Sequence, residues 1–177
     1  MLNIISIREY DAPEHILSLT YLHNKGRLNL IQSPNIYTFR SLIKNILHFN
    51  PSKILSDLEK ILRMLTIISR APKNSIVIIG CAPFNPWALF HLFFFNKYKK
   101  VLHTSWDDWN LGKGVHFNNK LGYFIWNQFL KKIDMVITTS KPAKNSLIEF
   151  KKDLKIKYIP HCVNFKNKSY IKRDYPS

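Results

Sequence analysis

Short apolar runs, rich in Val, Ile and Leu, recur along the chain and predict the strands of a buried sheet. The clearest is Ser75–Gly80, a continuous β-branched run that is typical of a parallel strand covered on both faces. The expected strands are Met1–Ile7, Leu28–Gln32, Ser75–Gly80, Lys100–Thr104, Asp134–Thr139 and Lys155–Ile159.

Between these runs, apolar residues return at every third or fourth position, which predicts amphipathic helices. The expected helices are Phe39–Phe49, Ser52–Arg70, Pro86–Tyr98, Phe117–Lys132 and a helix after Ser140 that ends at Phe150, and His15–His23 is either a strand or a short helix. In Ser52–Arg70 the apolar residues Ile54, Leu55, Leu58, Ile61, Leu62, Leu65 and Ile68 share one broad face, and in Phe117–Lys132 we expect Leu121, Phe124, Ile125 and Phe129 to face inward. Ser140 is suited to cap the last helix.

Strands that alternate with helices predict an α/β fold: a single Rossmann-like domain with a mostly parallel sheet covered by helices on both faces. We assign it to residues 1–164, and we interpret the polar, basic residues 165–177 as a linker or an exposed tail. Ligands of such sheets bind at the edge formed by the carboxyl ends of the strands. The loops expected there are Cys81–Asn85, Ser105–Val115, Ser140–Lys141 and His161–Asn164.

The charge of the chain points to an anionic partner. The 177 residues contain 27 Lys and Arg against 11 Asp and Glu, a formal net charge of +16. Nucleic acid, an anionic membrane surface and phosphorylated substrates all fit this charge. The alternative is a compositional bias towards Lys that serves no partner. No nucleic-acid-binding module is recognisable, which disfavours nucleic acid.

Several function classes lose support because their motifs are missing. The sequence has no G-x-x-x-x-G-K-[ST], no G-x-G-x-x-G and no G-x-S-x-G, which disfavours NTPases, standard dinucleotide enzymes and α/β-hydrolases. Cys81 and Cys162 lack the spacing of a zinc site, so we expect a reduced, cytoplasmic protein without metal or cofactor. Met1–Ile7 is better interpreted as a strand than as a signal peptide, and the apolar Trp87–Phe95 is far below the ~20 residues of a bilayer span.

The loop after Lys100–Thr104 carries the most distinctive chemistry. Trp106 and Trp109 flank two carboxylates, Asp107 and Asp108. Indole faces stack on sugars, and a carboxylate shielded from water is able to deprotonate an attacking hydroxyl. Asp107 or Asp108 is therefore the candidate general base. The alternative is that the Trp residues pack locally and the Asp residues cap a turn.

Three further candidates lie in the other loops of the same edge. Asn85 precedes a helix whose N-terminus suits an anionic group, although a plain strand-to-helix turn also explains it. Ser140 suits a phosphate or carboxylate, but capping alone accounts for it. His161 follows the last strand, where it is either a base or phosphate contact or a structural residue.

Three segments together resemble the N-terminal domain of GT-B glycosyltransferases of the glycosyltransferase family 4 type. They are Lys132–Ser140, Tyr158–Asn164 and His103–Asp108. Their order and spacing match a family pattern of helix, a-D-x-V-I-x-x-S, helix and I-P-N/H-G-V-D. The sequence departs from it at Cys162, at Asn164 and in the absence of glycine after the first strand.

The resemblance implies that this chain is the acceptor-binding half of a glycosyltransferase, with Asp107 and Asp108 catalytic. Its implied ligand is a saccharide or lipid-linked acceptor, and a nucleotide-sugar donor would be held by a second domain or a partner chain. The family usually needs no metal. Its lipid-linked acceptors suggest an anionic membrane surface at the inner face, for which Trp87–Phe95, Lys97, Lys99 and Lys100 are candidate contacts. The alternative, which we favour for the Phe residues, is a buried helix that covers the sheet. The implied acceptor contacts are His103, Trp106, Trp109, Asn85, Ser140 and His161. The rival hypothesis is a non-enzymatic basic module that binds nucleic acid or an anionic membrane surface.

Overall fold

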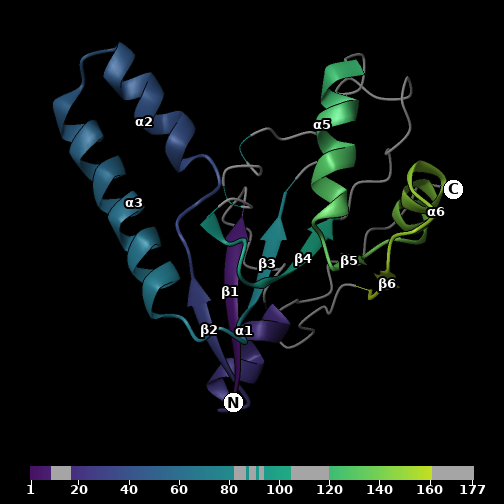
Figure 1. Cartoon of the computed structure of the whole chain (residues 1–177). Helices are drawn as coiled ribbons and strands as arrows, with labels where there is room; N and C mark the ends of the chain where they lie inside the picture. The colour runs from purple at the N-terminus through teal and green to yellow at the C-terminus, as the bar shows by residue number, and fades with distance from the viewer. Residues whose placement is uncertain (9–16, 82–86, 88–90, 92–93, 105–119, 161–177) are drawn as a thin grey trace, which may run out of the picture.

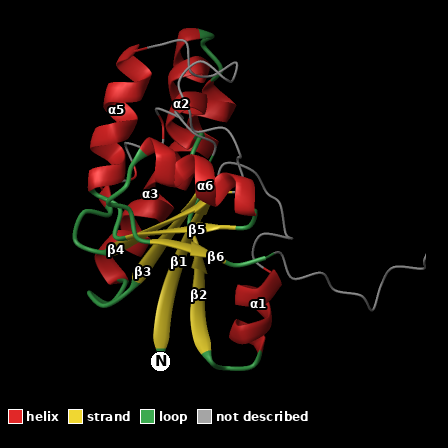
Figure 2. Ribbon diagram, turned by 90° about the vertical axis from the view of Figure 1, so that its right-hand side faces the viewer, coloured by secondary structure: helices red, strands yellow, loops and turns green. Residues whose placement is uncertain are grey.

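The structure of the protein, a computed structural model, describes residues 1–8, 17–81, 87, 91, 94–104 and 120–160. Their strands form a parallel sheet with helices on both sides, as Figures 1 and 2 show. The predicted α/β, Rossmann-like class is confirmed.

The sheet has six strands in the order β2-β1-β3-β4-β5-β6, and every neighbouring pair is parallel. The order reverses direction between β1 and β3, which is the point where ligands of open α/β sheets bind. The strand bounds are β1 (Leu2–Arg8), β2 (Leu28–Gln32), β3 (Ile76–Gly80), β4 (Lys99–Thr104), β5 (Met135–Thr138) and β6 (Ile156–Tyr158).

Five helices have bounds in the described residues: α1 (Leu17–Asn24), α2 (Thr38–Leu47), α3 (Pro51–Arg70), α5 (Lys120–Lys131) and α6 (Lys141–Phe150). The ambiguous segment His15–His23 thus contributes a helix. Trp87, His91 and Phe94 are also helical, but Phe95–Lys97 form a turn, so the helix expected over Pro86–Tyr98 ends early. In Figure 1, α2, α3 and α5 extend beyond the carboxyl ends of the strands.

The helix starts follow from local sequence. Ser140 accepts a hydrogen bond from the backbone N–H of Ala143 (3.1 Å), so its predicted capping role is confirmed. Asn50 caps α3 in the same way through the N–H of Lys53 (3.3 Å), and Pro51 follows it in the first turn. Proline suits that position because its missing N–H has no partner within the helix anyway.

The inward face predicted for α5 is partly wrong. Phe129 is buried as expected, but Phe124 is 58% exposed. The buried stripe of this helix instead passes through Trp126, Phe129 and Leu130, whose spacing puts them on one face. Phe124 is two positions before Trp126 and therefore points nearly opposite. The side chains of Leu121 and Ile125 lie outside the described residues.

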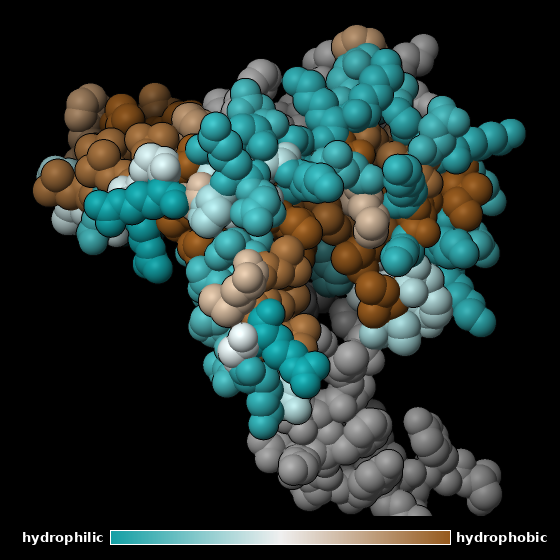
Figure 3. Space-filling view, turned by 60° about the horizontal axis from the view of Figure 1, so that its bottom comes forward, coloured by the Kyte–Doolittle hydropathy of each residue, from teal (hydrophilic) through white to brown (hydrophobic). Residues whose placement is uncertain are grey.

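The broad apolar face predicted for α3 is present, but only part of it is covered. The helix packs on α2 and the core through a stripe that contains the buried Asp57 and Met64. The adjacent stripe is exposed, because no described residue covers it. Figure 3 shows hydrophobic residues gathered over the α2–α3 hairpin on the left of the view. The exposed leucines of that stripe are Leu55, Leu58, Leu62 and Leu65.

Asp134 fastens β5 to β4, which yields a stability prediction. Its Oδ2 accepts a hydrogen bond from the backbone N–H of Lys100 (2.8 Å), and its own N–H donates to the Lys100 carbonyl (2.9 Å). Because Asp134 is exposed, we expect Asp134→Ala to lower the free energy of unfolding by only about 1 kcal/mol in urea denaturation. Asp153→Ala, another exposed acid, is the control and should change little; equal effects would contradict the assignment.

Candidate functional site

The carboxyl edge of the sheet receives only two of the predicted site residues within the described part of the chain. His103 is half-buried on β4, in register with Gly80 of β3 and Ile137 of β5. Ser140 follows β5 and caps α6, so both residues lie at the predicted edge. The other predicted site residues lie outside the described residues and stay predictions: Asp107, Asp108, Trp106, Trp109, Asn85 and His161.

An arginine, Arg8, lies at the point where the strand order reverses. Arg8 ends β1 in register with Gly80, and its Nε donates to Ser6 Oγ (3.2 Å). The chain after β2 continues beside the end of β1, since the N–H of Ser33 donates to the Ser6 carbonyl (2.9 Å) and that of Ile36 to the Arg8 carbonyl (2.8 Å). A half-buried guanidinium therefore lies where a ligand is expected.

Beside this point, a cavity of about 480 Å³ opens between the end of β2 and the α2–α3 hairpin. Hydroxyl, amide and cationic side chains dominate its wall. Ser33 also lines the cavity, but its Oγ is buried and has no hydrogen-bond partner among the described residues. The lining residues are Gln32, Ser33, Pro34, Asn35, Tyr37, Thr38, Ser41, Asp57, Lys60 and Arg63.

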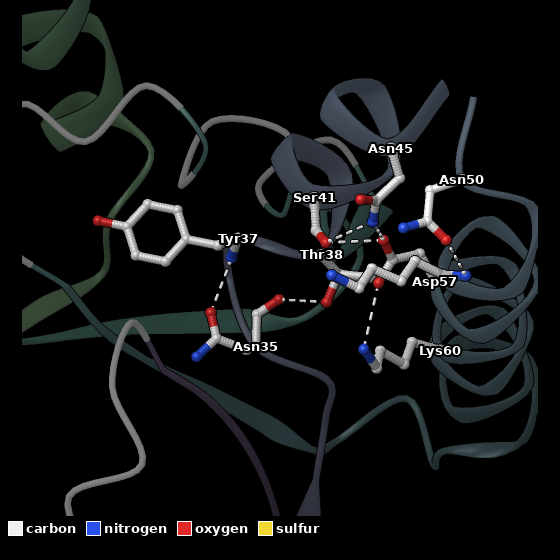
Figure 4. Close-up of polar contacts among 9 residues, drawn as sticks. Asn35, Tyr37, Thr38, Ser41, Asn45, Asn50, Asp57 and Lys60 are labelled. Atoms are coloured by element: carbon white, nitrogen blue, oxygen red, sulfur yellow. Dashed lines mark hydrogen bonds and ion pairs between the residues drawn. The ribbon is translucent and has the colours of Figure 1, made fainter. Parts of the chain in front are cut away.

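A buried carboxylate organises one wall of the cavity (Figure 4). Asp57 Oδ2 accepts hydrogen bonds from Ser41 Oγ (2.7 Å) and Asn45 Nδ2 (2.8 Å). Asp57 Oδ1 accepts one from Lys60 Nζ (3.1 Å), and Asn45 also donates to Ser41 Oγ (3.2 Å). The network joins α2 to α3 and fixes the side of the hairpin that faces the cavity.

The charge state of Asp57 follows from this network. Burial alone raises the pKa of the carboxyl, but the hydrogen bonds from Ser41, Asn45 and Lys60 and the Lys60 charge outweigh it. The pKa of Asp57 is consequently lower than its ordinary 3.8, and the group is a carboxylate at neutral pH. With its oxygens occupied by these donors, Asp57 acts as a structural anchor and is poorly placed to serve as a general base.

The opposite wall is set by a tight turn at Asn35. Its Oδ1 accepts from the backbone N–H of Tyr37 (2.8 Å), and its carbonyl accepts from Thr38 Oγ1 (2.7 Å). In Figure 4 the ring of Tyr37 points away from the Asp57 network. Since Lys60 and Arg63 add positive charge, the cavity suits a hydroxyl-rich ligand that also carries an anionic group.

The segment predicted to contact a membrane is largely internal where it is described. Phe95 and His91 are buried, and Lys100 Nζ donates to the carbonyls of Asn96 (3.2 Å) and Tyr98 (2.8 Å). Lys100 is therefore wrong as a membrane contact, and the segment covers the core instead. Lys97 and Lys99 remain exposed.

His91 is a fully buried histidine beneath the α2 helix. Its Nδ1 lies 3.3 Å from the Trp87 carbonyl oxygen, and its ring lies near Phe95 and edge-on to Phe39. Burial disfavours the imidazolium and lowers the pKa of His91 to about 4, although the Trp87 hydrogen bond opposes this shift. The ring is therefore neutral at pH 7.

Asp57, and with it the cavity, is absent from the site predicted from the sequence. A signal was present, because Asp57 comes three positions after Ile54 and four before Ile61, inside the apolar pattern of α3. A lone carboxylate on such a face requires buried donors. Ser41 and Asn45 on the preceding helix are spaced to supply them.

Among the described residues, no three His, Cys, Asp or Glu side chains are grouped to hold a metal ion. No helix in that part of the chain combines the length and apolar character needed to cross a membrane. Comparison with known proteins assigns no family: no protein-family model matches this chain, and no curated protein matches it.

Proposed function

We propose that this chain is the acceptor-binding half of a glycosyltransferase, which moves a sugar from a nucleotide-sugar donor to a saccharide or lipid-linked acceptor in cell-surface glycan synthesis. The observation that carries the proposal is where the family-like segments lie. Residues 134–140 form β5 and the cap of α6, and Ile159 donates its N–H to the Thr138 carbonyl (2.8 Å). These segments thus adjoin at the carboxyl edge, where the fold places ligands.

The cavity beside β2 supports an acceptor of this class. Saccharide hydroxyls need many donors and acceptors, which Asn35 and Ser41 offer. Lys60 and Arg63 match the phosphates of a lipid-linked acceptor. Such a ligand would extend from the cavity towards Arg8 and the ends of the central strands.

In this proposal Asp107 or Asp108 deprotonates the acceptor hydroxyl, and His103 and Ser140 contact the acceptor from neighbouring strands. A second domain or a partner chain binds the donor, so these residues alone should transfer sugar poorly, since the transition state forms between two domains. The reaction belongs to the cytoplasm and the inner face of the membrane. In the enzyme reconstituted with its donor-binding half, sugar transfer at normal turnover by both Asp107→Asn and Asp108→Asn would place the base elsewhere.

Acceptor binding tests the proposal directly. We expect a saccharide linked through diphosphate to a short, soluble lipid chain to bind, and Arg63→Ala to weaken it about tenfold in calorimetry, because one charged hydrogen bond is lost. Arg70→Ala is the matched control, since Arg70 lies on the same helix outside the cavity lining. Equal affinities of the two variants would contradict an acceptor site in this cavity.

The rival function is a non-enzymatic basic module, which the formal charge of +16 favours. Binding to random duplex DNA that weakens steeply with salt, together with no affinity for the saccharide ligand, would support nucleic acid instead.

A further inference from the structure

The turn between α2 and α3 holds an aromatic residue in a conformation that suits glycine. Phe49 has a φ of 49° and is 90% exposed. Two backbone hydrogen bonds close the end of α2: from the N–H of Phe49 to the Ile46 carbonyl (3.1 Å), and from the N–H of Asn50 to the Asn45 carbonyl (3.0 Å). This pairing is the Schellman motif, in which the left-handed residue is usually glycine.

Phe49 is therefore unfavourable twice over in the isolated chain. Its Cβ is strained in the left-handed region, and its ring lies almost wholly in water. At 90% exposure, packing within the chain offsets neither cost. A strained outlier of this kind indicates a use outside the fold, because the local structure gains nothing from it.

Other apolar side chains surround Phe49. Leu47 is 72% exposed and Leu55 68%, and Ile43 and Ile46 are also exposed. We call Ile43, Ile46, Leu47, Phe49 and Leu55 the hairpin tip. In Figure 1 the α2–α3 turn lies at an outer extreme of the molecule, far from the strands, so the tip protrudes.

The charge around the hairpin tip selects among possible partners. Lys44, His48 and Lys53 are exposed beside it, and residues 38–56 contain no Asp or Glu. A second copy of this strongly basic chain would be repelled. A protruding apolar tip with a cationic border instead matches an anionic bilayer, into which apolar side chains insert while lysines contact lipid phosphates.

We propose that the hairpin tip docks on anionic lipid bilayers, with Phe49 and Leu47 inserting at the boundary between headgroups and acyl chains and Lys44 and Lys53 binding lipid phosphates. The inference stands without the proposed sugar transfer. It also places the membrane contact at the α2–α3 turn, at the other end of α3 from Arg70. The segment around Phe95, where the contact was expected, is buried.

The test uses the whole chain and co-sedimentation with vesicles of phosphatidylcholine, alone or with about one third phosphatidylglycerol. Phe49→Gly separates binding from folding, because glycine suits a φ of 49° and should leave stability equal or higher. Its affinity for the anionic vesicles should fall about tenfold, since one inserting aromatic side chain is lost. Tyr21→Ala removes another exposed aromatic residue away from the tip and should leave binding unchanged.

A second pair of variants tests the charge. Lys44→Glu with Lys53→Glu should abolish the preference for anionic over neutral vesicles, whereas Lys152→Glu with Lys155→Glu, an equal change at another exposed site, should retain most of it. Equal vesicle binding by wild type and Phe49→Gly overturns the proposal. So does a wild-type chain that self-associates in sedimentation equilibrium through Phe49 and ignores vesicles, because the tip would then join copies of the chain.

Discussion

Asp57→Ala is expected to lower the free energy of unfolding by about 3 kcal/mol. The substitution removes the acceptor of hydrogen bonds from Ser41, Asn45 and Lys60. Ser41 and Asn45 would then lose a charged partner inside a helix–helix contact, and a buried donor without a partner costs about 1–3 kcal/mol. Urea denaturation should show the loss as a lower midpoint with an unchanged slope.

Three variants identify which part of the network matters. Lys60→Ala should cost at most about 1 kcal/mol, because the Lys60 side chain is 51% exposed and its ion pair is screened by water. The stability lost in Asp57→Asn should fall between the losses in Lys60→Ala and Asp57→Ala, since the amide oxygen still accepts a hydrogen bond but the NH₂ group faces Lys60. Glu59→Ala, an exposed acid on the same helix, is the control. If Asp57→Ala behaves like Glu59→Ala, the buried network contributes nothing to stability.

The strands were predictable because their signal is local. The run Ser75–Gly80 needs no tertiary information to be identified, and it forms β3 in the middle of the sheet. Ser140 was equally accessible, since capping depends on the next three residues. Parallel strands joined by helices then determine which loops share the carboxyl edge.

Side-chain exposure was less predictable, because periodicity gives the direction of a helix face but not the width that a neighbour covers. Leu55 and Leu58 continue the apolar pattern of α3, yet they lie just outside the stripe that packs on α2. Phe124 shows the same limit on α5. At the hairpin tip, Phe49 is both strained and exposed, which is the observation behind the proposed bilayer contact.

The candidate site was likewise only partly predictable from the sequence. The sequence identified the edge of the sheet and placed His103 and Ser140 there, but it missed the cavity beside β2. That cavity joins the end of β2 to Asp57 and Arg63 of α3, which are distant in sequence. Only the way the hairpin folds back brings these residues together.

Acidification should destabilise the protein through His91. The pKa of this histidine is 6.5 when unfolded and about 4 when folded, so the unfolded chain binds more protons between these values. Its contribution to stability is complete above about pH 6.5 and is lost as the pH falls towards 4, and the shift corresponds to about 3 kcal/mol. The pKa of Asp57 is lowered from 3.8, so the contribution of that carboxylate disappears only at still lower pH.

The difference between these two pH windows lets one variant isolate His91. In His91→Gln, the free energy of unfolding should change far less between pH 7 and pH 4.5 than in the wild type, whatever the variant's stability at pH 7. His48→Gln removes the exposed histidine at the end of α2 and should keep the wild-type dependence of the free energy of unfolding on pH. His48→Gln keeps the buried ring of His91. Parallel pH curves for all three proteins would therefore mean that His91 accepts a proton without unfolding, and that water reaches its Nε2 in the native state.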